Sequence, residues 1–485
     1  MATLLILGAG VSGHTAAMHA RRMLGKEHEV IVVTPNANWN WIPSNIWVGV
    51  GKMPVKKVLF PLEPLYKRKG IKFNQALAVA INPEGGDGHT RPFVTATSTR
   101  PGSEGEEIQI EYDFLINCTG PKLNFGATPG LGPDNGYTHS VCTAPHAAAT
   151  AEELKAAIAR CKAGESLRFV VGTGHGTCTC EGAAFEYTFN LEYVLREAGV
   201  RDRAEVIYLT NEATLGDFGV GGLTFTQQGF QTTSKLWTES LYRERGVEAV
   251  LGAHCSKIEP GVIHYEQLDG STHEMSYDFA MLLPPFKGAD MKAYDAAGED
   301  ISAQVFNPAG FLKVDANYAA GAYENWRATD WPKTYQSPLY DNIFAAGIAF
   351  APPHQISQPR TSPNGTVITP SPPRTGMPSG IIAKTVVMTI VDRIKGTGKP
   401  AYEAPMTGMG AACVASAGMS FWNGSAASMT MHPVVPDWQT YPKTGRDLKG
   451  TSGEIGLAGH WMKNLLHVLF LYKAKGRPFW WIVPE

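Results

Sequence analysis

The chain has 485 residues, 44% of them hydrophobic, which is enough apolar material for two or three domains with cores of their own. Its 42 basic and 44 acidic residues nearly cancel, which argues against a nucleic-acid partner. No apolar run reaches the length of a transmembrane helix, and we expect no signal peptide, because MATLLILGAG has neither a basic start nor a cleavage site. The seven cysteines are too few and too scattered for a disulfide scaffold, and their odd number predicts at least one free thiol.

The first predicted unit is a strand, a tight turn and an alanine-rich helix over residues 3–22. Gly8, Gly10 and Gly13 follow the strand in G-x-G-x-x-G spacing and open the helix. This context is typical of a dinucleotide-binding βαβ unit, whose glycines allow the turn and the close approach of a pyrophosphate. The next strand ends in residues 34–36, TPN, where an acidic residue usually holds the adenosine ribose, so the ribose contact stays open.

Two further segments extend the predicted cofactor site. Pro43 and Asn45 lie in a loop crowded with tryptophans, which suits either the protein core or a wall beside a flat ring. The apolar strand in EYDFLINCTG ends in Thr119 and Gly120, the pattern with which two-domain flavoproteins leave their first nucleotide domain. These residues are therefore candidate cofactor contacts.

The segment VCTAPHAAA places Cys142 and His146 four residues apart. A helix that begins near Thr143 would put both on one face and would accept the proline in its first turn. His146 could tune a thiol or relay a proton, or it could be an ordinary surface histidine at a helix start.

The segment 167–187, LRFVVGTGHGTCTCEGAAFEY, predicts a second strand, turn and helix. Cys178 and Cys180 stand where a nucleotide-binding turn would meet a phosphate. The helix dipole that favours a phosphate also favours a thiolate, so we expect a lowered thiol pKa here. The alternative is that both cysteines are small packing residues in a turn.

Residues 341–350, DNIFAAGIAF, predict a strand that returns to the first domain, with Gly347 close to the cofactor. A proline-rich irregular loop follows at residues 351–375. The helix after it has its N-terminus near residues 377–381, so that Gly380 could face a bound ring.

The tail, residues 396–485, ends in an apolar stripe at helical spacing with basic residues around it and more aromatic residues after it. This pattern favours an interfacial membrane anchor, and a core or dimer helix is the alternative. The stripe is Trp461, Leu465, Val468, Leu469 and Tyr472; the basic residues are Lys463, Lys473, Lys475 and Arg477; the later aromatic residues are Phe479, Trp480 and Trp481.

The sequence resembles the sulfide:quinone oxidoreductases, flavoproteins of the glutathione-reductase-like superfamily. Eight ordered segments across nearly the whole chain carry the resemblance: ILGAGVSG, IPSNIWVGVG, YDFLINCTGPKL, VCTAPHA, CTCEGAAFEY, PPFKG, IFAAGIA and AACVASAG. It implies an α/β fold with two Rossmann-like dinucleotide-binding domains and a C-terminal amphipathic membrane-anchoring region. The expected divisions are 1–145 and 301–395 for the two parts of the FAD-binding domain, 146–300 for the second Rossmann-like domain, and 396–485 for the quinone and membrane region.

The resemblance also implies roles for individual residues. Cys180 and Cys413 would be the redox pair beside the flavin, and Cys142 would assist or help to release product. Glu186 and His146 resemble family positions that handle protons. Three departures stand out: Cys178 is an extra thiol, Asp217 replaces a frequent histidine, and residues 377–379 replace a proline and lysine before the flavin-facing helix.

The implied enzyme binds FAD, oxidises sulfide to polysulfide or elemental sulfur, and reduces a membrane quinone. It would lie on the lipid bilayer surface as a peripheral, monotopic protein and could form a homo-oligomer; we assign no metal ligands. Three alternatives remain. A sulfide dehydrogenase flavin subunit would carry an export signal, a type II NADH:quinone oxidoreductase needs a better second fingerprint than GTGHGTC, and the chain could instead be a non-catalytic flavin or sulfur-carrier subunit.

Overall fold

The computed structural model describes residues 1–227, 229–373, 376–420 and 422–485 of a mixed α/β protein. Its first sheet has a parallel part in the order β21-β8-β1-β2-β5, which β6 and β7 extend in antiparallel fashion. The strands are β1 (Thr3–Leu7), β2 (Glu29–Thr34), β5 (Lys72–Asn82), β6 (Phe93–Ser98), β7 (Glu107–Glu111), β8 (Phe114–Asn117) and β21 (Ile343–Ala345), and β20 (Lys292–Ala293) pairs with β5.

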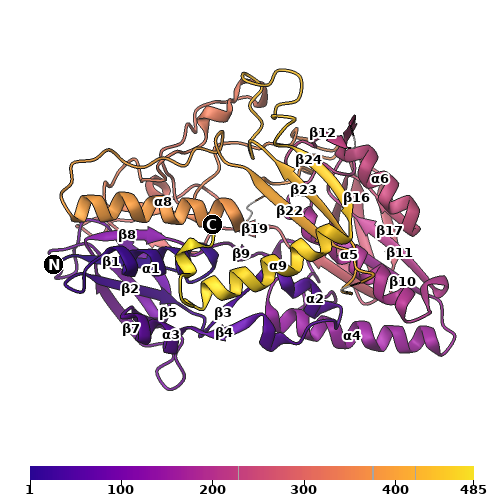
Figure 1. Cartoon of the computed structure of the whole chain (residues 1–485), viewed down its shortest axis with the longest axis horizontal. Coiled ribbons are helices and arrows are strands. Elements are labelled where there is room, and N and C mark those ends of the chain that lie inside the picture. Colours follow the sequence, from indigo (N-terminus) through magenta and orange to yellow (C-terminus); the bar gives the residue numbers. More distant parts are fainter. Residues whose placement is uncertain (228, 374–375, 421) are drawn as a thin grey trace.

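Helices α1 (Val11–Met23) and α8 (Gly376–Ile394) pack against each other beside this sheet, with α8 running along it in Figure 1. The strands β1 and β8 are wholly or largely buried runs of apolar residues, as parallel strands covered by helices require. Smaller elements complete this part: β3 (Asn38–Asn40), β4 (Leu59–Pro61), α2 (Asn45–Gly49), α3 (Leu62–Lys69), α7 (Ser302–Val305), β9 (Lys122–Leu123) and β19 (Phe286–Lys287).

The second sheet is parallel throughout, in the order β14-β11-β10-β18. Its elements are α4 (Ala144–Lys162), β10 (Leu167–Thr173), α5 (Glu181–Glu197), β11 (Ala204–Leu209), α6 (Ser234–Arg245), β14 (Val247–Val250) and β18 (Phe279–Leu283). An antiparallel sheet of β15 (Ala253–Glu259), β16 (Val262–Gln267) and β17 (Thr272–Ser276) adjoins it. The strand-turn-helix from β10 to α5 therefore repeats the arrangement of β1 and α1.

A third sheet joins strands from two distant parts of the chain, in the order β13-β12-β24-β23-β22. Its elements are β12 (Thr224–Gln227), β13 (Phe230–Thr233), β22 (Ala411–Ser416), β23 (Ala426–Met431), β24 (Ser452–Gly456) and the covering helix α9 (Leu457–Ala474). Strand β22 also contacts α5, and α9 crosses from this sheet back toward the first (Figure 1). The third sheet thus brings residues near 413 to the start of α5.

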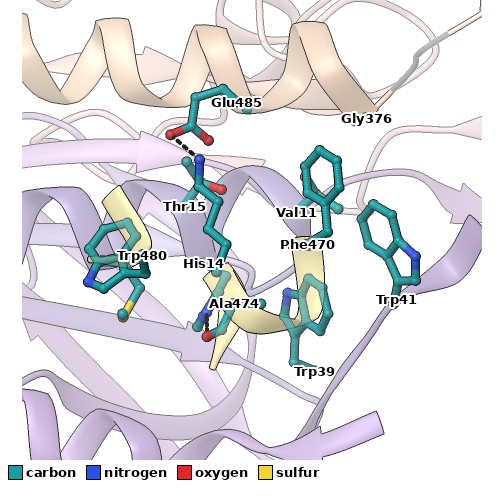
Figure 2. A pocket seen from close by; sticks show the side chains of 13 residues that line it. Val11, His14, Thr15, Trp39, Trp41, Gly376, Phe470, Ala474, Trp480 and Glu485 are labelled. Atoms are coloured by element: carbon teal, nitrogen blue, oxygen red, sulfur yellow. Dashed lines mark hydrogen bonds and ion pairs between the residues drawn. The ribbon is translucent and has the colours of Figure 1, made fainter. Parts of the chain in front are cut away.

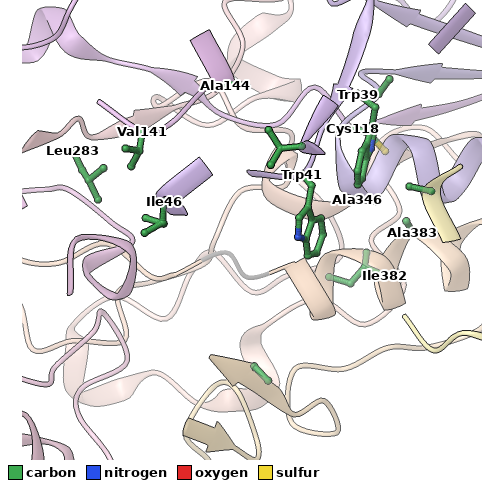
Figure 3. Packing of buried hydrophobic residues seen from close by; sticks show 14 of the residues in the cluster. Trp39, Trp41, Ile46, Cys118, Val141, Ala144, Leu283, Ala346, Ile382 and Ala383 are labelled. Carbon is green, nitrogen blue, oxygen red and sulfur yellow. The ribbon is translucent and has the colours of Figure 1, made fainter. Parts of the chain in front are cut away.

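One hydrophobic core runs through all three sheets. Figure 3 shows part of it, where Trp41, Ile382 and Ala383 lie among buried side chains from several elements. Cys118, just after β8, is buried in the same core.

The tail helix exposes its apolar stripe but not all of its basic residues. Trp461, Leu465, Val468 and Tyr472 are between 40% and 59% exposed. Two of the lysines expected to flank this stripe at the surface are buried instead, because Lys463 pairs with Glu186 (3.0 Å) and Lys473 pairs with Glu485 (2.7 Å). Across the described ranges of the chain, no helix joins the length and the apolarity that crossing a bilayer would demand.

Candidate active site

The turn after β1 has the shape of a dinucleotide-binding turn. Gly8 has a φ of +92°, and a Cβ there would lie 2.2 Å from the carbonyl oxygen of Cys118. A Cβ at Gly13 would lie 2.0 Å from the carbonyl oxygen of Gly8, so neither position accepts a side chain. Gly10, at the N-cap of α1, has no described atom within 4 Å of its Cβ position. The helix N-terminus is therefore open at Gly10, and the turn fits the phosphates of a dinucleotide.

The ends of neighbouring strands carry further cofactor candidates. Gly120 follows β8 with a φ of +70°, and no described atom lies within 4 Å of its Cβ position. Thr119 donates its N–H and its hydroxyl to Asn117 Oδ1, at 3.1 and 2.8 Å. Gly347 follows β21 with a φ of +70°, and a Cβ there would lie 1.9 Å from Ser12 Oγ in α1. Because β1, β8 and β21 are adjacent parallel strands, these residues share one edge of the sheet.

The remaining cofactor candidates lie in the tryptophan loop and in α8. Asn45 donates its amide to the carbonyl of Val141 (3.2 Å), which ties the tryptophan loop to the segment before α4. Pro43 is half-buried in the short turn just before Asn45. Gly380 lies near the start of α8, where a Cβ would be 3.2 Å from Glu485 Oε2. Both neighbourhoods contribute to an aromatic pocket.

This aromatic pocket joins the first sheet's helices to the tail helix (Figure 2). Trp39 and Trp41 line it from the tryptophan loop, and Phe470 and Trp480 line it from the tail. The rings of Trp41 and Phe470 are stacked with their centroids 4.7 Å apart, and only about 20 Å³ remains free. A planar ligand would enter this pocket by separating these rings.

Cys180 occupies a strained position at the start of α5. It is the N-cap residue and adopts the left-handed conformation, with φ of 70° and ψ of 34°, which is uncommon for a residue with a side chain. Strain of this kind often marks a functional position. Burial, reinforced by the charges of Glu181, Cys142 and Cys413, raises the pKa of the thiol to about 12. The prediction that the helix dipole would lower this pKa is therefore wrong, because burial and nearby negative charge outweigh the dipole.

Cys142 and Cys413 reach Cys180 from two other parts of the fold. Cys413 lies on β22, and its sulfur is 3.6 Å from the Cβ position of Gly182 in the first turn of α5. Cys142 lies just before α4, and burial raises the pKa of its thiol to about 11. The charges of both cysteines also raise the pKa of Cys180, and we call Cys142, Cys180 and Cys413 the sulfur cluster. All three are free and partly exposed.

A buried ion pair holds the Cys413 strand against the Cys180 helix. Glu186, on α5, accepts the N–H and the hydroxyl of Ser416 on β22, at 3.0 and 2.6 Å. Its other oxygen binds Lys463 of α9 at 3.0 Å. Burial raises the pKa of Cys413 to about 11, an effect that Lys463 opposes and Glu186 reinforces. The carboxylate of Glu186 thus joins three elements beside the sulfur cluster.

The ring of His146 lies beside Asp134 and Phe125. Its Nε2 lies 3.5 Å from Asp134 Oδ2, and its ring meets the edge of Phe125 with centroids 5.9 Å apart. Its Nδ1 is buried and has no hydrogen-bond partner in the described part of the chain. A proton-handling role for His146 remains a prediction.

Cys178 is fully buried and separate from the partly exposed cluster. Its sulfur donates to the carbonyl oxygen of Leu283 at the end of β18 (3.0 Å). Burial raises the pKa of this thiol well above its usual value. These contacts favour Cys180 over Cys178 as the thiol that pairs with Cys413.

Sequence reasoning missed two groups beside the cluster. The sequence pattern places Lys463 among the basic residues beside the membrane. Lys463 is only two residues from Trp461 and from Leu465, so it lies on another face of the helix, where it is buried. Glu181 is absent from the predicted site residues. Its place next to the candidate nucleophile Cys180 is the pattern that could have indicated it, because ionisable groups gather at functional sites.

No family model matches the chain. A sulfide-quinone reductase of Aquifex aeolicus (strain VF5) is 28% identical over 471 residues, which are 97% of this chain and 90% of that protein. The X-ray structure of the Aquifex aeolicus sulfide:quinone oxidoreductase has a TM-score of 0.75 at 27% identity and covers 98% of this chain and 92% of its own. The NDH2 of Plasmodium falciparum in complex with NADH shares the fold, with a TM-score of 0.62 at 12% identity, covering 99% and 97%. The resemblance to the sulfide:quinone oxidoreductases is thus confirmed over almost the whole chain, and the protein is an oxidoreductase.

Proposed function

We propose that the protein oxidises sulfide to polysulfide or elemental sulfur and reduces a membrane quinone, using FAD and the Cys180–Cys413 pair. The observation that carries this proposal is the position of Cys413, whose sulfur lies 3.6 Å from the Cβ position of Gly182, two residues after Cys180. The charge of Cys142, from a third element, also raises the pKa of Cys180. The similarity to the Aquifex aeolicus sulfide-quinone reductase extends through the segments that contain all three cysteines.

The residues of the first sheet suit FAD as the dinucleotide. The open N-terminus of α1 at Gly10 would hold the pyrophosphate, and Gly120 and Gly347 would line the path beside it. When bound, FAD supplies a two-electron acceptor that can receive electrons from a thiolate and deliver them to a quinone. The protein supplies the sulfur cluster and, near Gly380, the aromatic pocket.

The sulfur chemistry in this proposal is a thiol–disulfide exchange. HS⁻ attacks a bridge between Cys180 and Cys413, so that a new S–S bond forms to the sulfide sulfur and the bridging S–S bond breaks. The sulfide is oxidised, the bridge is reduced, and the thiolate of Cys413 is released. The Cys413 thiolate would join the outer sulfur of the Cys180 persulfide, which loses its proton, as bound FAD accepts two electrons. The bridge would then be closed again with one more sulfur, and the quinone would be the final electron acceptor. Cys142 would assist release of the product, and Glu186 and His146 are the proposed proton carriers.

The tail supports a peripheral position on the membrane, where quinones are dissolved. The exposed apolar residues of α9 are joined by Phe479 and Ile482, which are 64% and 68% exposed. Phe470 and Trp480, from the same tail, line the aromatic pocket. A quinone that leaves the bilayer beside α9 would therefore meet an aromatic pocket close to the start of α8.

The proline-rich segment argues against NADH as the electron donor. Thr369 donates its backbone N–H to the carbonyl of Gly176 (2.8 Å), and Ser371 donates to that of Cys178 (2.9 Å). A Cβ at Gly176 would lie 2.3 Å from the carbonyl oxygen of Val367. This segment therefore covers the second nucleotide-like turn, at the place where a pyrophosphate would approach.

Stopped-flow mixing of Cys413→Ser with sulfide tests the proposal. We expect the variant to keep its bound flavin and to lose flavin reduction by sulfide, since serine cannot form the bridge. Cys178→Ser is the matched control, because a hydroxyl can replace the bond to Leu283, and it should be reduced at the wild-type rate. Full reduction of Cys413→Ser by sulfide would contradict the assignment.

A further inference from the structure

A group of buried carboxyl groups lies behind the sulfur cluster and has no part in the proposed sulfur exchange. Glu181 follows Cys180 directly and is 0% exposed. Neither of its carboxylate oxygens has a hydrogen-bond partner in the described part of the chain. The nearby amide of Asn211 gives its hydrogens to the carbonyls of Gly176 and Cys178, at 3.1 and 3.2 Å. A buried carboxyl without partners is costly, so its presence calls for a functional explanation.

Glu181 faces a tight turn that carries a second carboxyl group. Its Oε2 lies 3.5 Å from the Cβ position of Gly219, two residues after Asp217. The N–H of Phe218, in the same turn, donates to Glu212 Oε1 at 2.9 Å. Tyr208 donates its hydroxyl to Glu212 Oε2 (3.2 Å) and lies 3.3 Å from the carbonyl oxygen of Glu181. Glu181, Glu212 and Asp217 therefore surround one turn.

This acidic group extends from the residue next to Cys180 to a polar cavity. Asp217 lines a polar cavity of about 280 Å³ together with Tyr323, Ser357 and Arg360. Its carboxylate accepts the hydroxyl of Ser357 and the N–H of Gly219. At the other end, Glu181 raises the pKa of the Cys180 thiol more than either Cys142 or Cys413 does. The three carboxyl groups thus extend from the residue next to Cys180 to the polar cavity.

Burial and mutual repulsion favour a proton that stays on this group of carboxyl side chains. Burial raises the pKa of Glu181 well above its usual value, and the charges of Glu212 and Asp217 reinforce this. Burial raises the pKa of Glu212 to about 7. Interacting carboxyl groups of this kind share protons, so their titration belongs to the group and not to one residue. The other titratable or charged side chains that face them are Cys178, Cys180, Tyr208, Tyr242, Tyr323, Arg360 and Arg446.

We propose that Glu181, Glu212 and Asp217 form a path that carries the proton released at Cys180 to the polar cavity. This inference deepens the proposed sulfide oxidation and rests on it. The proton that Glu181 retains passes to Glu212 and then to Asp217 and the cavity, which leaves Glu181 as a carboxylate. As H₂S becomes the attacking HS⁻ beside Cys180, its S–H bond breaks, the electron pair stays on sulfur, and an O–H bond forms on Glu181, so that each carboxyl group returns to its starting state.

The variant Glu181→Gln keeps the shape of the side chain and removes its proton exchange. Stopped-flow reduction of the bound flavin by sulfide should be about 10²-fold slower at neutral pH, the usual effect of losing a general base. The wild-type rate should rise with pH as the acidic group loses its proton, and this inflection should be missing in the variant. Infrared spectroscopy should show a protonated carboxyl band in the wild type that Glu181→Gln lacks.

Two further variants make the test specific. Glu192→Gln, on the same helix, removes a buried carboxylate that pairs with Arg196 (3.0 Å), and it should leave the flavin-reduction rate and its pH profile unchanged. Asp217→Asn tests the cavity end of the path and should slow the same step. Glu181→Gln should fold at least as stably as the wild type above pH 4.5, because the raised pKa of Glu181 means that the folded wild type loses stability as pH rises from there.

Failure of the path and failure of the proposed function are distinguishable. A wild-type flavin that sulfide reduces, beside unchanged rates and pH profiles in both Glu181→Gln and Asp217→Asn, would overturn the path alone. A wild-type flavin that sulfide does not reduce at any pH would overturn the proposed function, and the path would fall with it.

Discussion

At the scale of single residues, Lys463 lowers the pKa of the Cys413 thiol and so favours its reactive thiolate. Its ammonium group opposes the upward shift that burial imposes on the pKa of that thiol. We therefore expect Lys463→Met to raise the pKa of Cys413 above about 11 and to slow alkylation of this thiol by iodoacetamide at every pH below that value. The measurement is the alkylation rate of the Cys413 peptide against pH, read by mass spectrometry.

The matched control for this prediction is Lys473→Met. Both lysines lie on α9 and both pair with a buried carboxylate, Glu186 in one case and Glu485 in the other. Each substitution leaves a carboxylate without its cation and should cost about 3–5 kcal/mol of the free energy of unfolding. Equal slowing of Cys413 alkylation in both variants would show that lost stability, and not the lost charge, is the cause.

At the scale of elements, local sequence patterns predicted individual strands and helices but not the contacts between distant elements. The fingerprint of Gly8, Gly10 and Gly13 predicted the first strand, turn and helix, because a glycine turn and an apolar strand are encoded within 20 residues. Cys413 lies near the start of α5 because β22 packs against this helix. Strand β22 belongs to a sheet that also contains β12, from far earlier in the chain. No local pattern encodes such pairings. For the same reason, the periodicity of α9 showed its apolar stripe but not that Lys463 is buried against Glu186.

The proline-rich segment gives the prediction at this scale. In Gly176→Ala, the new methyl group would lie 2.3 Å from the carbonyl oxygen of Val367, so the segment must shift, at a cost of about 1–3 kcal/mol. We expect faster hydrogen exchange at the amides of Thr369 and Ser371, which bond to this turn. Gly126→Ala, which meets no described atom within 4 Å, should leave both exchange rates unchanged. Unchanged exchange in Gly176→Ala would show that these bonds do not hold the segment in place.

At the scale of the whole molecule, the proposed contact with a membrane rests on the exposed face of α9. Leu465 and Val468 are 56% and 59% exposed, one turn apart on the helix that reaches the aromatic pocket. Burying each side chain in the lipid interface contributes about 1.5–3 kcal/mol, so the double variant Leu465→Glu, Val468→Glu should lower binding to lipid vesicles by at least tenfold. The measurement is co-sedimentation with vesicles, together with flavin reoxidation by a water-soluble quinone, which should be unaffected because the substitutions lie on the outer surface.

The control for membrane binding is another exposed leucine that lies outside the tail. Leu339 is 50% exposed, and Leu339→Glu should leave vesicle binding at the wild-type level. If any loss of exposed apolar surface weakened vesicle binding, Leu339→Glu and the α9 double variant would both bind less. Insertion of α9 into the lipid interface predicts weaker binding only in the α9 double variant. If the α9 double variant still binds vesicles as the wild type does, another surface makes the contact. The quinone would then have to reach the aromatic pocket by a path that does not run along α9.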